Sequence, residues 1–425
     1  MPRRHKDLFG GIASFPALCA ATERAARGKR RAPSTAAFLA RQETEVIALW
    51  RALRERTYRP GRYTTFEIHD PKRRQISAAP FRDRVVHQAL CTVIEPIFER
   101  GFIHDSYANR IGKGTHRAVR RYEHYRDRHA QVLRADIYRY FPAIDHAILQ
   151  ADLRRRIACP DTLWLIDTLI DASNPQEPVD LWFPGDDLLT PLTRRRGLPI
   201  GNLTSQFFAN VYLDRLDHFV KEVLRAPGYV RYVDDFALFH DDPAVLAEWR
   251  ERIATFLVGR RLRLHPRKTF LIASAEPATF LGYELHPGGH RRLPEASVRR
   301  FRNRLRGLRD GWRAGTVAWP EVQQRVQAWI AHAEWADTWR LRHAIFRGGI
   351  FDPARRPDRP PVGGASCAAG LGTTTPGTCA RPTATGTTPA TGTTTSVSAW
   401  PVRSQAGAGA STDAPGEWGS VQGRS

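Results

Sequence analysis

Three aspartates have the spacing and surroundings of a carboxylate cluster. Asp234 and Asp235 are adjacent within the apolar, aromatic stretch RYVDDFALF, which predicts a strand, a tight turn and a second strand. Because consecutive strand residues point to opposite faces, two adjacent aspartates face one site only where the chain turns. Asp136 follows another apolar run, LRADIYRYF, and pairing of the two strands would bring it beside Asp234.

Like charges this close repel strongly unless a cation neutralises them. Two metal ions about 4 Å apart activate an attacking hydroxyl and stabilise the leaving oxygen of a phosphoryl transfer. We therefore predict that Asp136, Asp234 and Asp235 bind two Mg²⁺ ions. An adjacent aspartate pair alone is weak evidence, because aspartate is common in turns. Asp145, further along, is expected to cap a helix or form a salt bridge.

The elements around these residues mix helices with short strands, which predicts an α+β fold. A capped apolar periodicity predicts one helix over 35–57, and RDRVVHQALCTVIEPIFE predicts a buried helix. Two strand-like runs flank a basic turn at Lys72–Arg74. After Asp136, Pro142 is expected to begin a helix, and the glycine-containing loop GLPIGN leads into a long one.

Composition separates the two ends of the chain from its centre. Residues 1–34 are basic, and we expect an irregular N-terminal arm. Residues 291–350 predict a helical, strongly basic module. Residues 351–425 are dominated by Gly, Thr, Ala, Pro and Ser, so we expect disorder. This tail contains the pentad ATGTT twice, either as a plain linker or as the by-product of a nucleotide repeat translated in an alternate frame.

The charge of the chain indicates a polyanionic partner. Its 425 residues include 65 Lys and Arg against 43 Asp and Glu, a formal net charge of +22. Nucleic acid is the usual partner of such a protein. Five cysteines without a CxxC or a matching histidine pattern argue against disulfides and structural zinc. We find no signal-peptide pattern and no membrane-spanning run, and expect a soluble, cytoplasmic protein without a membrane partner.

These motifs resemble those of reverse transcriptases, in the same order along the chain. RYVDDFALF resembles the Y-x-D-D box, DIYRYFPAID the first aspartate motif, PKRRQISAAPFRDRVVHQAL the fingers motif, and FLGYEL the primer-grip segment. The resemblance covers about residues 45–345. It implies a right-hand polymerase fold, with fingers and palm over 35–290 and a helical thumb over 291–350. It also implies an RNA-directed DNA polymerase that uses a template RNA, a primer and dNTPs.

The resemblance implies roles for further residues near the nucleotide. The Ile137 carbonyl joins the metal ligands. Lys72 and Arg74 lie where the fingers contact the incoming triphosphate, with a solvated turn as the alternative. Phe141 matches the aromatic gate that excludes a ribose 2′-hydroxyl, although core packing is an alternative that applies equally to Tyr140.

Basic residues further along have implied roles as well. Lys268 matches a palm lysine near the leaving pyrophosphate, where it could donate a proton, with an ordinary surface lysine as the alternative. Five thumb arginines are expected to bind the template–primer backbone without sequence preference: Arg299, Arg300, Arg302, Arg304 and Arg306.

The loop LPIGNLTSQ distinguishes subfamilies. Ile200 stands where most reverse transcriptases have a glutamine, and Gln206 where they have a proline. We predict that Ile200, Gly201 and Gln206 contribute to the nucleotide site. This departure resembles the enzymes of diversity-generating retroelements, which implies error-prone copying at template adenines and a small basic accessory protein oligomer as partner. The alternatives are a group II intron-type or defence-associated reverse transcriptase, and a catalytically inactive RNA-binding protein.

Overall fold

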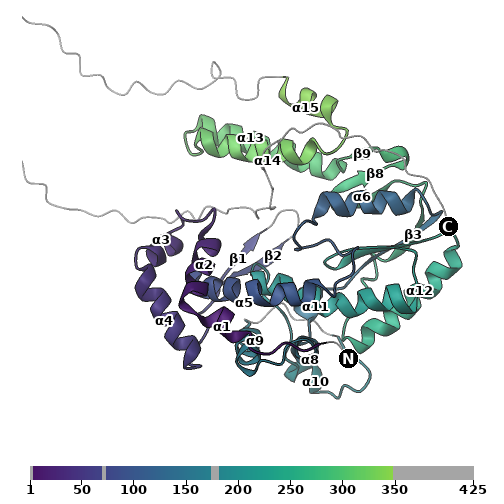
Figure 1. The fold of residues 1–425 in the computed structure, drawn as a ribbon. Helices are drawn as coiled ribbons and strands as arrows, with labels where there is room; N and C mark the ends of the chain where they lie inside the picture. Colours follow the sequence, from purple (N-terminus) through teal and green to yellow (C-terminus); the bar gives the residue numbers. More distant parts are fainter. Residues whose placement is uncertain (1–2, 69–72, 174–180, 348–425) are drawn as a thin grey trace, which may run out of the picture. The chain divides into compact units, whose positions relative to one another are not determined.

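The computed structural model describes residues 3–68, 73–173 and 181–347 (Figure 1). Helices and antiparallel sheets alternate along these residues, which confirms the expected α+β class. Lys72 and the segment 351–425 lie outside the described residues, so the expectations for them remain predictions. Within the described ranges, no helix combines the length and apolarity needed to cross a bilayer.

A four-stranded antiparallel sheet carries the aspartates. Its strand order is β4–β5–β3–β6, formed by β3 (Gln131–Asp136), β4 (Gly228–Tyr232), β5 (Asp235–His240) and β6 (Phe270–Ala273). Side chains alternate between its two faces. Leu133 and Leu238 enter one buried cluster, whereas Val132 and Phe239 enter a second. The sheet is therefore covered on both faces.

Helices cover each face of this sheet. Among the helices that contribute to the first cluster are α5 (Phe81–Glu99), α11 (Leu203–His218) and α12 (Pro243–Gly259). The second includes side chains of α6 (Thr115–Arg126), and Figure 1 shows α6 and α11 on opposite sides of β3. The helix α11 continues into a π-helical turn, Phe219–Val223. The buried helix expected from RDRVVHQAL is α5.

Most of the described residues between 3 and 34 are helical, which corrects the expectation of an irregular arm over 1–34. The helices α1 (Phe9–Ala13) and α2 (Phe15–Ala26) pack against α5. They bury Ile12, Leu18 and Ala21. These small and apolar residues are interleaved with the basic ones, and their burial against α5 stabilises the helices.

Two helix boundaries differ from the prediction. The helix expected over 35–57 is divided into α3 (Pro33–Leu39) and α4 (Gln42–Arg54). Pro142 lies inside the short α7 (Tyr140–Ala143), and the following helix α8 (His146–Arg154) begins after Asp145. The Asp145 carboxylate accepts a hydrogen bond from Ile148 N at 3.1 Å. Asp145 is thus the N-cap of α8, as expected, and the cap sets the start of the helix.

The remaining elements flank the central sheet. The predicted hairpin of the fingers motif is β1 (Thr64–Ile68) with β2 (Arg74–Ala78). A three-stranded sheet joins β7 (Ala278–Phe280), β8 (Tyr283–Leu285) and β9 (Arg291–Arg292) around a 3₁₀ turn, Pro287–Gly289. The other helices are α9 (Pro160–Asp171), α10 (Thr190–Thr193), α13 (Glu295–Arg313), α14 (Trp319–Ala333) and α15 (Trp339–Phe346).

The C-terminal described region is helical, as predicted for the basic module. The helix α13 buries an apolar stripe at helical spacing: Val298, Phe301, Leu305, Leu308 and Trp312. Phe301 stacks on Trp329 of α14, with ring centroids 3.7 Å apart. The basic residues of α13 are thereby left on the outer side of the helix.

Candidate active site

The adjacent aspartates lie at a two-residue turn. Tyr232 of β4 pairs with Asp235 of β5, so Val233 and Asp234 form the turn itself. Val233 has a φ of 58°, in the left-handed region, which is unfavourable for a β-branched residue. Arg231 Nη1 donates to the Val233 carbonyl at 3.0 Å and holds this conformation. The strand–turn–strand prediction is confirmed.

Asp136 lies directly opposite Asp235 in the β3–β5 register. Directly opposite residues share a face of the sheet, with Cα atoms about 4.5–5.5 Å apart. Strand pairing therefore brings Asp136 to the adjacent aspartates, with Asp235 rather than Asp234 as its direct partner. Ile137 N donates to the Asp234 carbonyl at 3.2 Å, which places Ile137 beside the turn.

Two cationic side chains contact the carboxylates. Lys268 Nζ lies 2.7 Å from Asp136 Oδ2. The loop that carries Lys268 is fixed to the end of β3, because His265 N donates to the Asp136 carbonyl at 2.7 Å. Arg134 Nη2 lies 2.9 and 3.2 Å from the two carboxylate oxygens of Asp235. Lys268 was singled out from the sequence, whereas Arg134 was missed.

The carboxylates repel one another. Burial, together with the charges of Asp136 and Asp235, raises the pKa of Asp234 to about 6. Burial also raises the pKa of Asp235, although Arg134 opposes that shift. A divalent cation among these groups would favour their ionised forms.

The chemistry of this donor set fits Mg²⁺, a hard cation that prefers carboxylate oxygens. In the part of the chain that the structure describes, no group of three or more His, Cys, Asp or Glu side chains has the arrangement of a metal site. The ion pairs give a physical reason, because Asp136 and Asp235 each engage a cationic side chain. In this structure Lys268 and Arg134 act as the counter-ions of Asp136 and Asp235.

A buried ion pair supports the turn from the opposite face of the sheet. Arg231 Nε and Nη2 donate to the two carboxylate oxygens of Asp217, on α11, at 2.7 and 2.6 Å. Tyr229 donates its hydroxyl to the same carboxylate at 2.8 Å, and Arg231 Nη1 reaches Asn210 Oδ1 at 3.2 Å. Sequence reasoning did not single out Arg231 or Asp217. The available signal was a charge within an apolar strand, which requires a buried partner.

The two aromatics after the first aspartate have different surroundings. Tyr140 is buried, and its hydroxyl donates to the Ala209 carbonyl at 2.5 Å. Phe141 is only half-buried, with its ring centroid 5.6 Å from that of Tyr140. Tyr140 is therefore a core residue, and Phe141 remains the candidate for the gate.

The loop before α11 is fastened to the β1–β2 hairpin. Ser77 N donates to the Ile200 carbonyl at 2.9 Å. The Asn202 side chain donates to the Ser77 carbonyl at 3.0 Å and accepts from Ala79 N at 3.2 Å. Asn202 was missed from the sequence, although it immediately follows the glycine that was singled out. The side-chain amide of Asn202 thus forms the two hydrogen bonds that the backbone of a neighbouring strand would otherwise form at the end of β2.

Gly201 requires the absence of a side chain. Its φ is 120°, and a Cβ atom would lie 3.0 Å from Ile76 Cγ2. Ile200 is half-buried beside it, and Gln206 is half-buried in the first turn of α11. The close approach of Gly201 to β2 thus fixes the loop that carries Ile200 and Gly201. This loop leads directly into α11, which carries Gln206.

The basic residues predicted to contact nucleotide or nucleic acid are exposed where they are described. Arg74 is exposed at the first position of β2, while Lys72 lies outside the described residues. The five arginines that were predicted to bind the nucleic-acid backbone are all exposed on α13: Arg299, Arg300, Arg302, Arg304 and Arg306.

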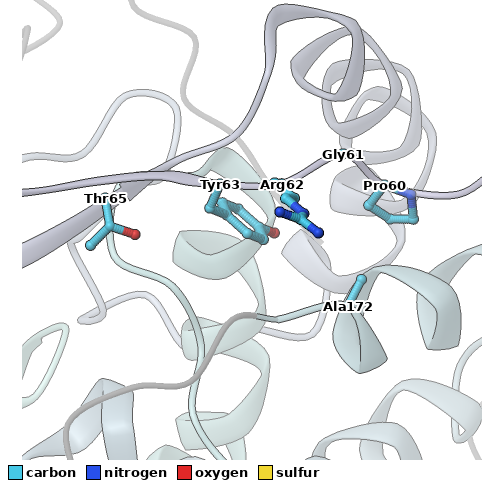
Figure 2. Close-up of a pocket in the computed structure, with 6 residues that line it drawn as sticks. All are labelled: Pro60, Gly61, Arg62, Tyr63, Thr65 and Ala172. Carbon is cyan, nitrogen blue, oxygen red and sulfur yellow. The ribbon is translucent and has the colours of Figure 1, made fainter.

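A cavity of about 330 Å³ lies beside β1 and the end of α9 (Figure 2). Its lining residues are Pro60, Gly61, Arg62, Tyr63, Thr65 and Ala172. None of them carries a carboxylate or was singled out from the sequence. The predicted site residues therefore do not line this cavity.

The chain belongs to the reverse transcriptase family. The family model described as reverse transcriptase (RNA-dependent DNA polymerase) matches residues 68–285, just over half of the chain. The matched segment begins in β1 and ends in β8, and it includes all three aspartates. The fold is accordingly the right-hand polymerase fold, in agreement with the antiparallel sheet described above.

Curated relatives are more distant. The chain is 25% identical over 264 residues to Protein YkfC of Escherichia coli (strain K12), covering 53% of this chain and 66% of that protein. It is 21% identical over 309 residues to the Group II intron-encoded protein LtrA of Lactococcus lactis subsp. cremoris, covering 57% of this chain and 50% of that protein. The chain thus spans about two thirds of the length of Protein YkfC and about half of the length of LtrA.

Solved structures with a similar arrangement include two telomerases. Apo telomerase from Candida tropicalis, truncated from its C-terminal domain, matches with a TM-score of 0.41 and 14% identity over 55% of each chain. Telomerase from Candida albicans, in complex with a TWJ fragment of telomeric RNA, matches with a TM-score of 0.37 and 12% identity over 58% of this chain and 49% of that chain. The fold assignment therefore rests on the family match and on the sheet.

Proposed function

We propose that this protein is an RNA-directed DNA polymerase that copies a template RNA into cDNA. The observation that carries the proposal is the carboxylate cluster, in which Asp136 lies directly opposite Asp235 and Asp234 occupies the adjoining turn. The family match over the same strands supports it. The net charge of +22 supports a nucleic acid as partner.

In the proposed reaction, the 3′-hydroxyl of a primer attacks the α-phosphate of a dNTP. A new P–O bond forms, the bond to the β-phosphate oxygen breaks, and pyrophosphate leaves. Asp136, Asp234 and Asp235, with the Ile137 carbonyl, would hold two Mg²⁺ ions, which when bound activate the hydroxyl and stabilise the leaving oxygen. Lys268 contacts Asp136 here, and once that carboxylate holds a metal ion it would be free to donate a proton to the leaving pyrophosphate.

Other residues select and hold the substrates. Phe141 excludes the 2′-hydroxyl of a ribonucleotide, and Lys72 and Arg74 contact the triphosphate. The loop residues Ile200 and Gly201, with Gln206, border the nascent base pair. The exposed thumb arginines bind the template–primer backbone through phosphate contacts, which makes binding dependent on salt.

Within the family, we assign the protein to the enzymes of diversity-generating retroelements. The supporting observation is Ile200, an apolar side chain at the position where most reverse transcriptases have a glutamine. Without that amide, one polar contact to the nascent pair is lost, and copying at template adenines becomes error-prone. A structured template RNA and a small basic accessory protein oligomer are the partners of this assignment.

A second candidate is a group II intron-type reverse transcriptase. The observation that favours it is the 21% identity to the Group II intron-encoded protein LtrA. This candidate predicts faithful copying, so the errors made during synthesis separate the two assignments.

The test is primer extension on an RNA template with Mg²⁺ and dNTPs, followed by sequencing of the products. We expect synthesis by the wild type, none by Asp235→Asn, and undiminished synthesis by the control Asp127→Asn, an exposed carboxylate directly after α6. Adenine-biased errors that decline in Ile200→Gln support the retroelement assignment, whereas faithful wild-type copying supports the intron-type candidate. Absence of synthesis even with cognate RNA and accessory protein overturns the polymerase proposal.

A further inference from the structure

The two cations at the carboxylate cluster are held in different ways. Lys268 has a side chain that is 41% exposed, and its ammonium contacts Asp136. Arg134 has a side chain that is only 12% exposed and is held at several points. Its Nη1 donates to the Thr279 carbonyl, and its Cζ lies 5.0 Å from the centroid of the Phe280 ring.

Both contacts that fix Arg134 come from β7. Thr279 is the central residue of that strand, and Phe280 is a fully buried residue at its end. Arg134 itself is two residues before Asp136 on β3, so the two side chains share one face of the sheet. Asp235 lies on that face too, because it pairs with Asp136. Arg134 therefore connects β7 to a carboxylate of the cluster.

This geometry suits a permanent contact rather than a displaceable one. A single nitrogen of the guanidinium, Nη2, contacts both oxygens of Asp235, and this restricts the orientation of the carboxylate as well as its distance. The ring beneath it and the carbonyl beside it restrict the guanidinium to the same place in the absence of Asp235. Lys268 has a flexible stem and can withdraw when another cation approaches Asp136.

We propose that Arg134 is a positioning residue that orients the Asp235 carboxylate and stays bound to it throughout the reaction. The proposal rests on the proposed polymerase function. It assigns unequal roles to the aspartates: Asp136 and Asp234 would give their full charge to bound metal ions, whereas Asp235 shares its charge with Arg134. Strand β7 thereby sets the position of a catalytic carboxylate.

The proposal has a specific consequence for metal binding. A fixed positive charge beside a ligand carboxylate weakens the attraction of that carboxylate for a divalent ion. Removal of Arg134 should therefore leave metal affinity equal to or higher than that of the wild type. The rate of nucleotide incorporation should nevertheless fall, because the orientation of Asp235 is lost.

The chain offers a matched control in Arg291. Arg291 also donates to both oxygens of a carboxylate, Glu123, at 2.7 Å each, and its Cζ lies 4.1 Å from the Trp335 ring centroid. It fastens β9 of the same three-stranded sheet to α6, without touching the aspartates. Arg291→Gln thus removes an equivalent ion pair away from the cluster.

The experiment compares wild type, Arg134→Gln, Arg134→Lys and Arg291→Gln in the full chain. We would measure kcat and KM for dNTP incorporation on an RNA template, Mn²⁺ binding by electron paramagnetic resonance, and the melting temperature without metal. For Arg134→Gln we expect kcat to fall about 10–100-fold with little change in KM, and Mn²⁺ to bind at least as tightly as in the wild type. Arg134→Lys keeps the charge without the planar guanidinium that contacts Thr279 and Phe280, and should restore only part of kcat.

Each outcome bears on one claim. If Arg134→Gln and Arg291→Gln have equal melting temperatures and lower kcat by the same factor, the role of Arg134 is merely structural. Weaker Mn²⁺ binding by Arg134→Gln would also overturn the proposal, because the guanidinium would then aid metal binding. If the wild type itself synthesises no DNA, the proposed function fails, and the Mn²⁺ measurement still decides whether Arg134 opposes metal binding.

Discussion

Arg231 and Asp217 form a fully buried ion pair beneath the turn that carries the adjacent aspartates. Both charged ends of the pair are satisfied, since Tyr229 and Asn210 complete the hydrogen bonds. The same guanidinium holds the Val233 carbonyl, so one side chain supports both the sheet and the strained turn. The two faces of the sheet are therefore organised by arginines: Arg231 on one and Arg134 on the other.

Removal of one partner of this pair should be strongly destabilising. Asp217→Ala leaves Arg231 buried without its counter-charge, and we expect a loss of about 3–5 kcal/mol in the free energy of unfolding. Urea denaturation monitored by tryptophan fluorescence measures it. The control is Glu248→Ala, which breaks the exposed pair with Arg252 and should cost no more than about 1 kcal/mol. Equal losses in the two variants would contradict the role of the buried pair.

Substitutions of the two aromatic residues after Asp136 should have different effects on nucleotide selection and on stability. Phe141→Ala opens the space near the sugar, and we expect the preference for dNTP over rNTP to fall by at least about tenfold. Tyr140→Phe removes the hydrogen bond to the Ala209 carbonyl and should lower stability by about 1 kcal/mol while leaving that preference intact. Competitive incorporation of dNTP and rNTP measures the ratio. An unchanged ratio in Phe141→Ala would remove the gate assignment.

The contact between the loop and the hairpin should control nucleotide affinity. Gly201→Ala places a Cβ atom against Ile76 at a φ that L-residues rarely adopt, and we expect a cost of about 1–3 kcal/mol. Because the added Cβ atom would push the loop before α11 away from the β1–β2 hairpin, we expect KM for dNTP to rise by a larger factor than kcat falls. Steady-state kinetics test this. Gly307→Ala is the control, since that glycine lies on exposed α13 with nothing within 4 Å of an added Cβ atom.

One histidine should make stability depend on pH in the alkaline range. Hydrogen bonding to Asp214, and then to Glu222 and the Gly101 carbonyl, raises the pKa of His218 to about 9. The unfolded value is about 6.5, so this stabilisation is fully present below about pH 6.5 and is lost as pH rises through about 9. We would measure the free energy of unfolding by denaturation at pH 6, 7.5 and 9.5. It should decline with rising pH in the wild type and change less in His218→Gln. A decline of equal size in the variant would assign it to other groups.

Local patterns were sufficient for much of the fold and for the position of the aspartates. Alternation and turn chemistry located β4, the turn and β5, and the Asp145 cap was predictable because capping is a short-range interaction. The helices at 9–26 were not predicted, because their stability comes from burial against α5, which is distant in sequence. For the same reason the periodicity over 35–57 did not reveal the break before Gln42.

The residues that support the site were harder to find. Arg134 pairs with Asp235, 101 positions away, and Arg231 with Asp217, 14 positions away on a different element. Periodicity reports which face a side chain occupies, but it does not report which partner it meets there. Alternation could have placed Arg134 on the face of Asp136, since the two are separated by one residue of the same strand.

The alternation of β3 between two covered faces has a consequence for folding. A shift of this strand by one residue against its neighbours would exchange its two sets of side chains. Arg134 and Asp136 would then enter the apolar cluster beneath the sheet, while Leu133 and Ala135 would take their places at the site. The buried charges would make such a state far less stable than the native one. The sequence therefore disfavours the shifted register by itself: the misaligned molecules that would lack the site are also the ones with an unstable fold.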